Sequence, residues 1–227
     1  MISDFISLFY PITCAVCNHS LYKHETELCH RCYIDLPKSN FHTTNDNPVA
    51  RLFYGRVEIQ VAASYYLFHK SGNTQRLLHA LKYKNRSEIG TVIGKWYGEE
   101  LKQNEVFTSS ELILPVPLHK NKLKKRGYNQ SSLFASGLSE SLGIPYSNDL
   151  LIRKSDTSTQ TKKSRFERWE NVENKFKVHA PEQIKNKKIL LVDDVVTTGA
   201  TLEACAAELL KTEGVTVSIA TIAFAQI

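Results

Sequence analysis

Residues 188–205 constrain the fold of this chain more than any other stretch. They open on a continuous apolar run at 189–192, Ile-Leu-Leu-Val, which is typical of a strand buried on both faces of a parallel sheet. Two carboxylates, Asp193 and Asp194, follow at the end of this strand. After a short loop, apolar residues recur at helical spacing until Gly214, a good helix stop, and a second strand-like run comes next. The sequence predicts a strand–loop–helix–strand unit with both carboxylates at its ligand-binding edge.

The loop of this unit has the chemistry of a phosphate cradle. A loop that enters a helix presents unpaired backbone N–H groups and the positive end of the helix dipole. Thr197, Thr198 and Thr201 add hydroxyl donors, and Gly199 lets the backbone approach a ligand closely. The two carboxylates suit sugar hydroxyls or a hydrated divalent cation. Phosphate, sugar diol and metal together describe a phosphoribosyl group; the alternative is an ordinary strand-to-helix turn.

Four cysteines near the N-terminus are arranged as two Cys-x-x-Cys pairs, Cys14/Cys17 and Cys29/Cys32. Two such pairs can close a tetrahedral Zn²⁺ site of structural type, and so short a segment would take its folding energy from the metal. The alternative, a redox role, normally uses one such pair. His19, His24 and His30 are expected on the surface. Cys205 is expected among the core leucines of the later helix.

Two polar stretches carry further candidate ligand-binding residues. A basic segment follows the Pro115-Val-Pro-Leu118 run and is expected as a loop beside the phosphate site, where it suits pyrophosphate or a nucleic-acid backbone. Its candidate residues are Pro117, Leu118, His119, Lys120, Lys122, Lys124, Lys125 and Arg126. The polar stretch 154–171 is expected as a lid, with Arg165, Arg168 and Trp169 for charge and stacking, or else as a plain exposed loop.

Periodicity predicts the remaining elements. Strands are expected at 57–68 and 111–118, and the next strand region at 143–153; helices are expected at 73–82, 89–101 and 130–142, and a linker or loop at 37–50. This order of strands and helices predicts a parallel α/β sheet with helices on both faces and right-handed crossovers. The loops after Pro117, Arg153 and Asp194 are expected to gather at one end of the sheet.

Composition bounds the class of protein. A hydrophobic content of 42% is ordinary for a globular core, and the net charge of +6 is clustered, which favours anionic ligands. No apolar run approaches the roughly 20 residues of a membrane span. The N-terminus lacks the basic and apolar regions of a signal peptide, so a cytoplasmic protein with no transmembrane segment is expected.

The stretch Val192–Thr201 resembles the 5-phosphoribosyl-1-pyrophosphate (PRPP) signature of type I phosphoribosyltransferases. The resemblance implies that Asp193 and Asp194 bind the ribose 2′- and 3′-hydroxyls, and that the loop binds the 5′-phosphate, with Mg²⁺ accompanying PRPP. It places PRPP-binding residues at Asp193, Asp194, Val195, Val196, Thr197, Thr198, Gly199, Ala200 and Thr201.

Three features together resemble the ComF/ComFC family of competence-linked, amidophosphoribosyltransferase-like proteins. They are the double Cys-x-x-Cys, the block from Pro115 to Gln130 with Arg126-Gly-Tyr-Asn-Gln130, and the PRPP signature; the 160–171 stretch matches further. The resemblance implies a Rossmann-like type I phosphoribosyltransferase domain at 49–227 and a four-cysteine zinc module with linker at 1–48. It also implies structural Zn²⁺ and a link to DNA uptake in natural transformation.

Three functions compete at this stage. The first is a protein that binds PRPP or ribose 5-phosphate and handles single-stranded DNA in transformation, with other competence proteins as partners; Tyr128 and Trp169 would interleave with the basic residues for stacking. The second is a phosphoribosyltransferase that uses Mg²⁺ and releases pyrophosphate, with Asp193 and Asp194 as catalytic candidates. The third is a regulator that binds PRPP without turnover. No acceptor-pocket signature separates them.

Overall fold

The computed structural model describes residues 11–154 and 175–226 of the 227-residue chain. The helices in these ranges are α2 (His30–Ile34), α3 (Pro48–Arg51), α4 (Asn73–Tyr83), α5 (Glu88–Leu101), α6 (Glu105–Thr108), α7 (Lys120–Arg126), α8 (Gln130–Leu142) and α10 (Ala200–Leu209), with 3-10 turns η1 (Phe41–Thr43) and η2 (Pro181–Gln183). The strands are β1 (Ala62–Phe68), β2 (Leu112–Pro115), β3 (Leu151–Arg153), β4 (Phe176–Val178), β5 (Lys188–Val196) and β6 (Thr216–Ala225).

A parallel sheet with the strand order β1-β6-β5-β2 forms the centre of the described chain. Strand β5 lies in its interior, which explains its unbroken apolar sequence. Alternate residues of this strand enter two separate cores: Leu190 and Val192 face one, and Ile189 and Leu191 face the other. The predicted parallel α/β architecture is confirmed.

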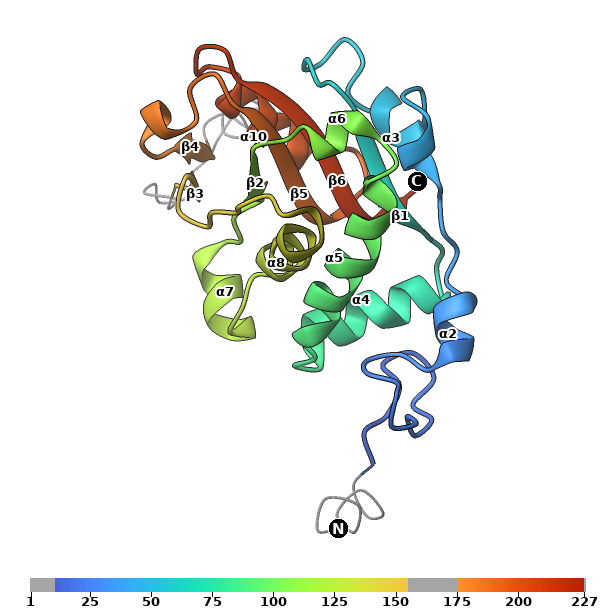
Figure 1. The fold of residues 1–227 in the computed structure, drawn as a ribbon. Helices are drawn as coiled ribbons and strands as arrows, with labels where there is room; N and C mark the ends of the chain where they lie inside the picture. Colours follow the sequence, from blue (N-terminus) through green and yellow to red (C-terminus); the bar gives the residue numbers. More distant parts are fainter. Residues whose placement is uncertain (1–10, 155–174, 227) are drawn as a thin grey trace, which may run out of the picture.

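Helices cover both faces of the sheet (Figure 1). Helices α4, α5 and α8 pack on one face, while α3, α10 and the antiparallel β3–β4 pair pack on the other. The N-terminal module joins the first of these cores, because Cys14, Val16, Leu28 and Cys32 are buried within it. The four-cysteine segment therefore shares a core with the large domain.

Helices α5 and α8 approach each other unusually closely because glycines meet at their crossing. A Cβ on Gly137 would lie 2.0 Å from the backbone oxygen of Thr91, and one on Gly94 would lie 2.4 Å from that of Phe134. Neither position has room for a side chain. This close packing holds the N-terminal end of α8 beside the end of strand β5, where the candidate site lies.

Two sequence predictions about connections are wrong. The stretch 37–50, expected as a linker or loop, pairs with β1 through hydrogen bonds from Leu67 N to Pro37 O (2.8 Å) and from Ser39 N to Tyr65 O (2.9 Å). It then forms η1 and α3 around the buried side chain of Asn47, which caps α3 and binds three backbone carbonyls. These contacts join residues that are far apart in the sequence, and the polar composition of 37–50 does not predict them.

The strand region 143–153 is also different from the prediction. Residues 145–147 form one parallel bridge at the edge of β2, and β3 then pairs with β4 outside the main sheet. The loop after Arg153 consequently does not follow a strand of the main sheet. The strands expected at 57–68 and 111–118 are shorter, because only 62–68 and 112–115 find a partner strand.

Three cross-contacts tie the N-terminal module to the domain. The rings of Tyr33 and Trp96 meet edge to face at 4.7 Å, and Lys38 forms a 2.6 Å ion pair with Glu100. Arg86, just after α4, binds Glu27 at 2.8 Å and also donates to the carbonyl of Thr13 at 3.0 Å. The division at residue 48 into a zinc module with linker and a large domain stays a prediction. Within the described ranges, no helix is long and apolar enough to cross a membrane.

Candidate phosphoribosyl site and cysteine cluster

The acidic pair lies in the last residues of β5, which continues to Val196 and so includes both carboxylates, not only the apolar run before them. One oxygen of Asp193 accepts hydrogen bonds from the Ser131 hydroxyl (2.8 Å) and from the backbone N–H of Asp194 (2.8 Å). Burial and the charge of Asp194 raise the pKa of Asp193 to about 7, although these hydrogen bonds and the Lys82 cation act to lower it. Asp193 can therefore change its protonation near neutral pH.

Asp194 has a partner that the sequence did not reveal. The ammonium nitrogen of Lys82, in the last turn of α4, lies 2.8 Å from Oδ2 of Asp194, and both side chains are mostly buried. In the sequence, Lys82 only marks the end of the helix expected at 73–82. The alternation of charged and aromatic residues there contains no signal for a contact with a carboxylate more than a hundred positions away.

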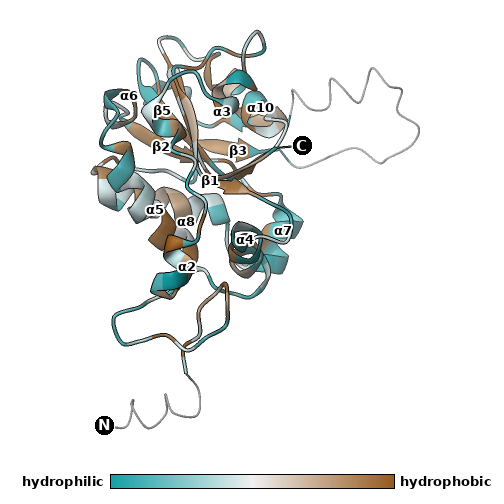
Figure 2. Ribbon diagram, turned by 90° about the vertical axis from the view of Figure 1, so that its right-hand side faces the viewer, coloured by the Kyte–Doolittle hydropathy of each residue, from teal (hydrophilic) through white to brown (hydrophobic). Residues whose placement is uncertain are grey.

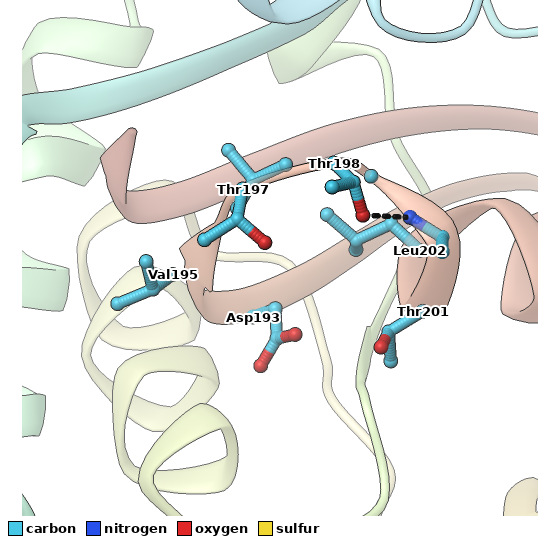
Figure 3. A pocket seen from close by; sticks show the side chains of 9 residues that line it. Asp193, Val195, Thr197, Thr198, Thr201 and Leu202 are labelled. Carbon is cyan, nitrogen blue, oxygen red and sulfur yellow. Dashed lines mark hydrogen bonds between the residues drawn. The ribbon is translucent and has the colours of Figure 1, made fainter. Parts of the chain in front are cut away.

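The threonine loop surrounds a small hollow beside Asp193 (Figure 3). The hollow has a volume of about 40 Å³ and is lined by Asp193 and residues 195–202. That volume accommodates about three water-sized groups, which is the number of terminal oxygens on a phosphate monoester. The hydroxyl of Thr198 accepts a 3.5 Å hydrogen bond from the backbone N–H of Ala200, at the start of α10. The loop thus has the size and the donors that phosphate binding requires.

Residues from the N-terminal half of the domain support this loop. Gly199 has a φ of +77°, and a Cβ there would lie 3.1 Å from the buried ring of Phe53. The guanidinium of Arg56 donates to the carbonyl of Thr198 at 2.9 Å and pairs with Glu203 on α10. Neither Phe53 nor Arg56 could be predicted from the sequence, since they lie far from the motif and form no pattern with it.

The basic segment is a helix and not the predicted loop. Helix α7 runs from Lys120 to Arg126, with the ring nitrogen of His119 accepting from the N–H of Asn121 and Gly127 ending it in the left-handed conformation. Lysine and arginine are good helix formers, and cations in the last turn are stabilised by the helix dipole. Four cations of α7 are exposed: Lys120, Lys122, Lys124 and Lys125. The candidate residues Pro117 and Leu118 lie just before the helix.

Tyr128, for which stacking on bases was predicted, makes a hydrogen bond within the protein. It is partly buried, and its hydroxyl donates a 2.5 Å hydrogen bond to the carbonyl of Leu81 on α4. The exposed aromatic ring in this area is Tyr83, with 66% of its surface exposed. The lid candidates Arg165, Arg168 and Trp169 lie outside the described residues, so their role stays a prediction.

The four N-terminal cysteines converge on one point. Their sulfur atoms all lie within 4.8 Å of one another, and among the described residues this set contains no histidine. Burial raises the pKa of Cys32, whereas backbone N–H donors overcome the effect of burial and lower the pKa of Cys14 to about 7. The cluster has the ligands and the spacing to hold a zinc ion. His19, His24 and His30 are exposed and Cys205 is buried in the core, as predicted.

The chain is similar to several known proteins. The family described as "Phosphoribosyl transferase domain" matches residues 129–226. "DNA utilization protein YhgH" of Escherichia coli O157:H7 is 33% identical over 146 residues, which are 63% of this chain and 63% of that protein. "Competence protein F" of Haemophilus influenzae is 32% identical over 143 residues, 61% of this chain and 62% of that one. The chain is therefore similar to ComF-type, phosphoribosyltransferase-like proteins over about three fifths of its length.

Further comparisons are partial. "Competence protein ComFC" of Streptococcus pneumoniae is 33% identical over 111 residues, 49% of this chain and 45% of the relative. The chain therefore matches less than two thirds of the length of these curated relatives. A solved adenine phosphoribosyltransferase of Leishmania donovani is 14% identical and has a TM-score of 0.41, with 71% of this chain and 82% of that one covered.

Proposed function

We propose that this chain is a ComF-type protein that binds PRPP with Mg²⁺ at the end of β5. The carboxylates of Asp193 and Asp194 would hold the ribose hydroxyls, and the threonine loop would hold the 5′-phosphate. The observation that carries the proposal is the juxtaposition of this acidic pair with a phosphate-sized hollow at the carboxyl edge of a parallel sheet. Mg²⁺ would neutralise charge on the pyrophosphate group. The basic residues of α7 are further candidates for binding this group.

Single-stranded DNA is the second ligand of the proposed function. The names of the relatives refer to DNA utilization and to competence. The exposed cations of α7 supply a surface that suits phosphodiesters, and we place this handling of DNA in natural transformation, with other competence proteins as partners. Free cysteines throughout the described chain agree with a reducing, cytoplasmic location, and the four-cysteine cluster would hold one structural Zn²⁺.

A catalytic function is favoured by the burial of Asp193 beside Asp194, which raises the pKa of the Asp193 carboxyl to about 7. A carboxylate with a pKa of about 7 is well placed to accept a proton at neutral pH. In a transfer reaction, an acceptor nucleophile would form a bond to C1 of the ribose while the bond from C1 to pyrophosphate breaks. The proton of the acceptor would pass to Asp193, and Mg²⁺ would accompany the leaving pyrophosphate.

Thermal unfolding of the full chain with Mg²⁺ and PRPP tests the binding proposal. A ligand at a hundred times its dissociation constant adds about 2.7 kcal/mol to stability, so the melting temperature of the wild type should rise by several degrees. Asp193→Asn with Asp194→Asn should abolish this rise, and Asp149→Asn, which changes an exposed carboxylate, should preserve it. A wild type that shows no rise would contradict PRPP binding.

Two assays separate the functions from each other. Pyrophosphate release from PRPP with candidate bases and amines, abolished by Asp193→Asn, would establish an enzyme; PRPP binding without release would favour a binding protein or regulator. For DNA, replacing Lys122, Lys124 and Lys125 by Ala should weaken oligonucleotide binding and flatten its salt dependence while zinc content stays constant. Equal salt dependence in both proteins would remove α7 from the DNA surface.

A further inference from the structure

A groove separate from the phosphoribosyl site lies between the cysteine module and α4. It has a volume of about 600 Å³, and residues 15–18 of the first cysteine turn form one wall. The other wall comes from α4 and the segments at its two ends, through Ser71, Gln75, Arg76, His79 and Lys84. We call it the knuckle groove. Its size is that of a pocket for a ligand much larger than a single ion.

The charge of the knuckle groove is positive and uncompensated. Arg76 and Lys84 are exposed, and neither forms an ion pair with any described residue, while no acidic residue lines the groove. The neighbouring cations of the same segment behave differently: Lys82 pairs with Asp194, and Arg86 pairs with Glu27. Two of the four cations in the segment 76–86 are therefore used within the protein, and the two that line the groove remain available to an anion from outside.

Aromatic rings continue from the groove toward α7. The rings of His79 and Tyr83 lie 5.0 Å apart, and the guanidinium of Arg126 lies 5.5 Å from the centre of the Tyr83 ring. Arg76, His79 and Tyr83 are spaced by three and four residues, so they form a stripe along one face of α4. Helices α4 and α7 meet at their C-terminal ends, where the Arg126–Tyr83 contact joins them, and both carry hydrophilic residues (Figure 2).

We infer that the knuckle groove binds single-stranded nucleic acid, with phosphates on Arg76 and Lys84 and a base stacked on Tyr83. The inference rests on the DNA handling proposed above and identifies a surface for it that runs from the cysteine module along α4 to α7. The two cations are eight residues apart, which is about 12 Å along a helix, so they can contact different phosphates of one strand. Cations interleaved with stacking rings suit single strands of any sequence.

Fluorescence anisotropy with labelled oligo(dT) tests the inference on the full, zinc-loaded chain. The test variant is Arg76→Gln with Lys84→Gln. The matched control is Lys185→Gln with Lys211→Gln, which removes the same charge after η2 and α10, at the end of the molecule away from the N-terminal module (Figure 1).

The test variant should bind oligo(dT) about tenfold or more weakly than the wild type at low salt. Its slope of log affinity against log salt should be smaller by about 1.4, since each lost phosphate contact removes about 0.7. The control should match the wild type.

A stacking variant distinguishes nucleic acid from an acidic polypeptide. Tyr83→Leu keeps an apolar side chain at this exposed position but removes the aromatic face. It should weaken oligo(dT) binding about five- to a hundredfold, the usual contribution of one base–aromatic contact. Poly-glutamate should compete poorly. If Tyr83→Leu binds like the wild type and poly-glutamate competes as well as oligo(dT), the occupant is an acidic polypeptide and the inference is wrong.

The remaining outcomes separate this inference from the proposed function. A wild type that binds oligo(dT), with both groove variants unaffected, would overturn the knuckle groove and leave DNA handling in place. A wild type without affinity for oligo(dT) at low salt would overturn both. The PRPP-dependent melting shift should be the same in all groove variants, because none of the changed residues lines the phosphate hollow. This melting shift is measured first in each variant. A variant that has lost it would be misfolded as a whole.

Discussion

The phosphate loop and the cysteine cluster are both short motifs, but different parts of the structure hold them in place. The loop at 197–201 depends on residues that are distant in sequence: Phe53 packs against Gly199, and Arg56 binds the carbonyl of Thr198. The cysteine ligands come from within one segment, 14–32, and their sulfurs converge within 4.8 Å. The core supplies the geometry of the loop, whereas a metal ion would hold the cluster together.

This difference concerns preorganisation. Close thiols cannot all ionise without a cation to balance their charge, so the cluster is expected to need its ion in order to stay folded. The loop has hydrogen bonds, a packed ring and an ion pair before any ligand arrives. The two sites should consequently respond in opposite ways to removal of their ligands.

Removal of zinc should have the largest effect. Structural zinc contributes on the order of 10 kcal/mol or more in small metal modules, so chelation should unfold the cysteine segment. Hydrogen exchange should show protection lost at residues 14–32 and retained in β5 and α10. Cys14→Ser with Cys32→Ser should reproduce this, and Cys205→Ala should retain about one zinc per chain. Full protection after verified metal loss would show that the core alone holds the module.

Gly199→Val should have the largest effect on the loop. A branched residue at φ +77° is strained, and its side chain would press on the ring of Phe53. PRPP binding should fall at least tenfold in titration calorimetry, with zinc content unchanged. Gly55→Val also changes a glycine of positive φ, but its Cβ would meet no atom within 4 Å, so it is the matched control. Unchanged PRPP affinity in Gly199→Val would contradict the preformed loop.

The pH dependence of PRPP binding tests Asp193. The pKa of this carboxyl is raised to about 7 in the folded protein, so it is protonated below that pH. Binding to Mg²⁺ and sugar hydroxyls needs the carboxylate, and affinity should therefore rise up to tenfold per pH unit toward pH 7 and then level off. By the same linkage, the stability contribution of the protonated group is lost as pH rises from about 4 to about 7.

Asp193→Asn serves as the control for this titration. The variant should lose affinity and keep only the pH dependence that belongs to the phosphates of PRPP itself. Isothermal titration in buffers of different ionisation enthalpy measures the proton released on binding below pH 7. Identical pH profiles for wild type and variant would assign the dependence to the ligand and remove Asp193 from it.

Lys82→Gln should have the smallest effect. The change removes the partner of Asp194, so the free protein loses a mostly buried ion pair while the carboxylate becomes open to Mg²⁺. We expect a melting temperature a few degrees lower and a PRPP affinity altered by less than about tenfold. Lys95→Gln, which breaks an exposed ion pair with Glu140, is the control and should change neither quantity. Equal melting temperatures of the two variants would mean that the Lys82–Asp194 pair adds nothing.

Much of the fold could be read from local patterns. The apolar run of β5, the leucine spacing of α4 and the Gly143 stop of α8 each depend on residues close in sequence, and all appear in the structure. The convergence of the four cysteines was also predictable, because paired spacing over so short a segment leaves little choice of geometry. The prediction of a loop at 119–126 was wrong, because local helix propensity and the capping residues His119 and Gly127 form helix α7 there.

By itself, the sequence determined the parallel α/β core, the phosphate loop motif and the four-cysteine cluster. Only the tertiary structure decided which distant residues meet them: Lys82 with Asp194, Ser131 with Asp193, and Arg56 with the loop. The knuckle groove is likewise formed by two segments that share no pattern. The physical reason is that periodicity reports how one element faces the core, whereas a contact between two elements depends on sheet order and close helix packing, which are properties of the whole chain.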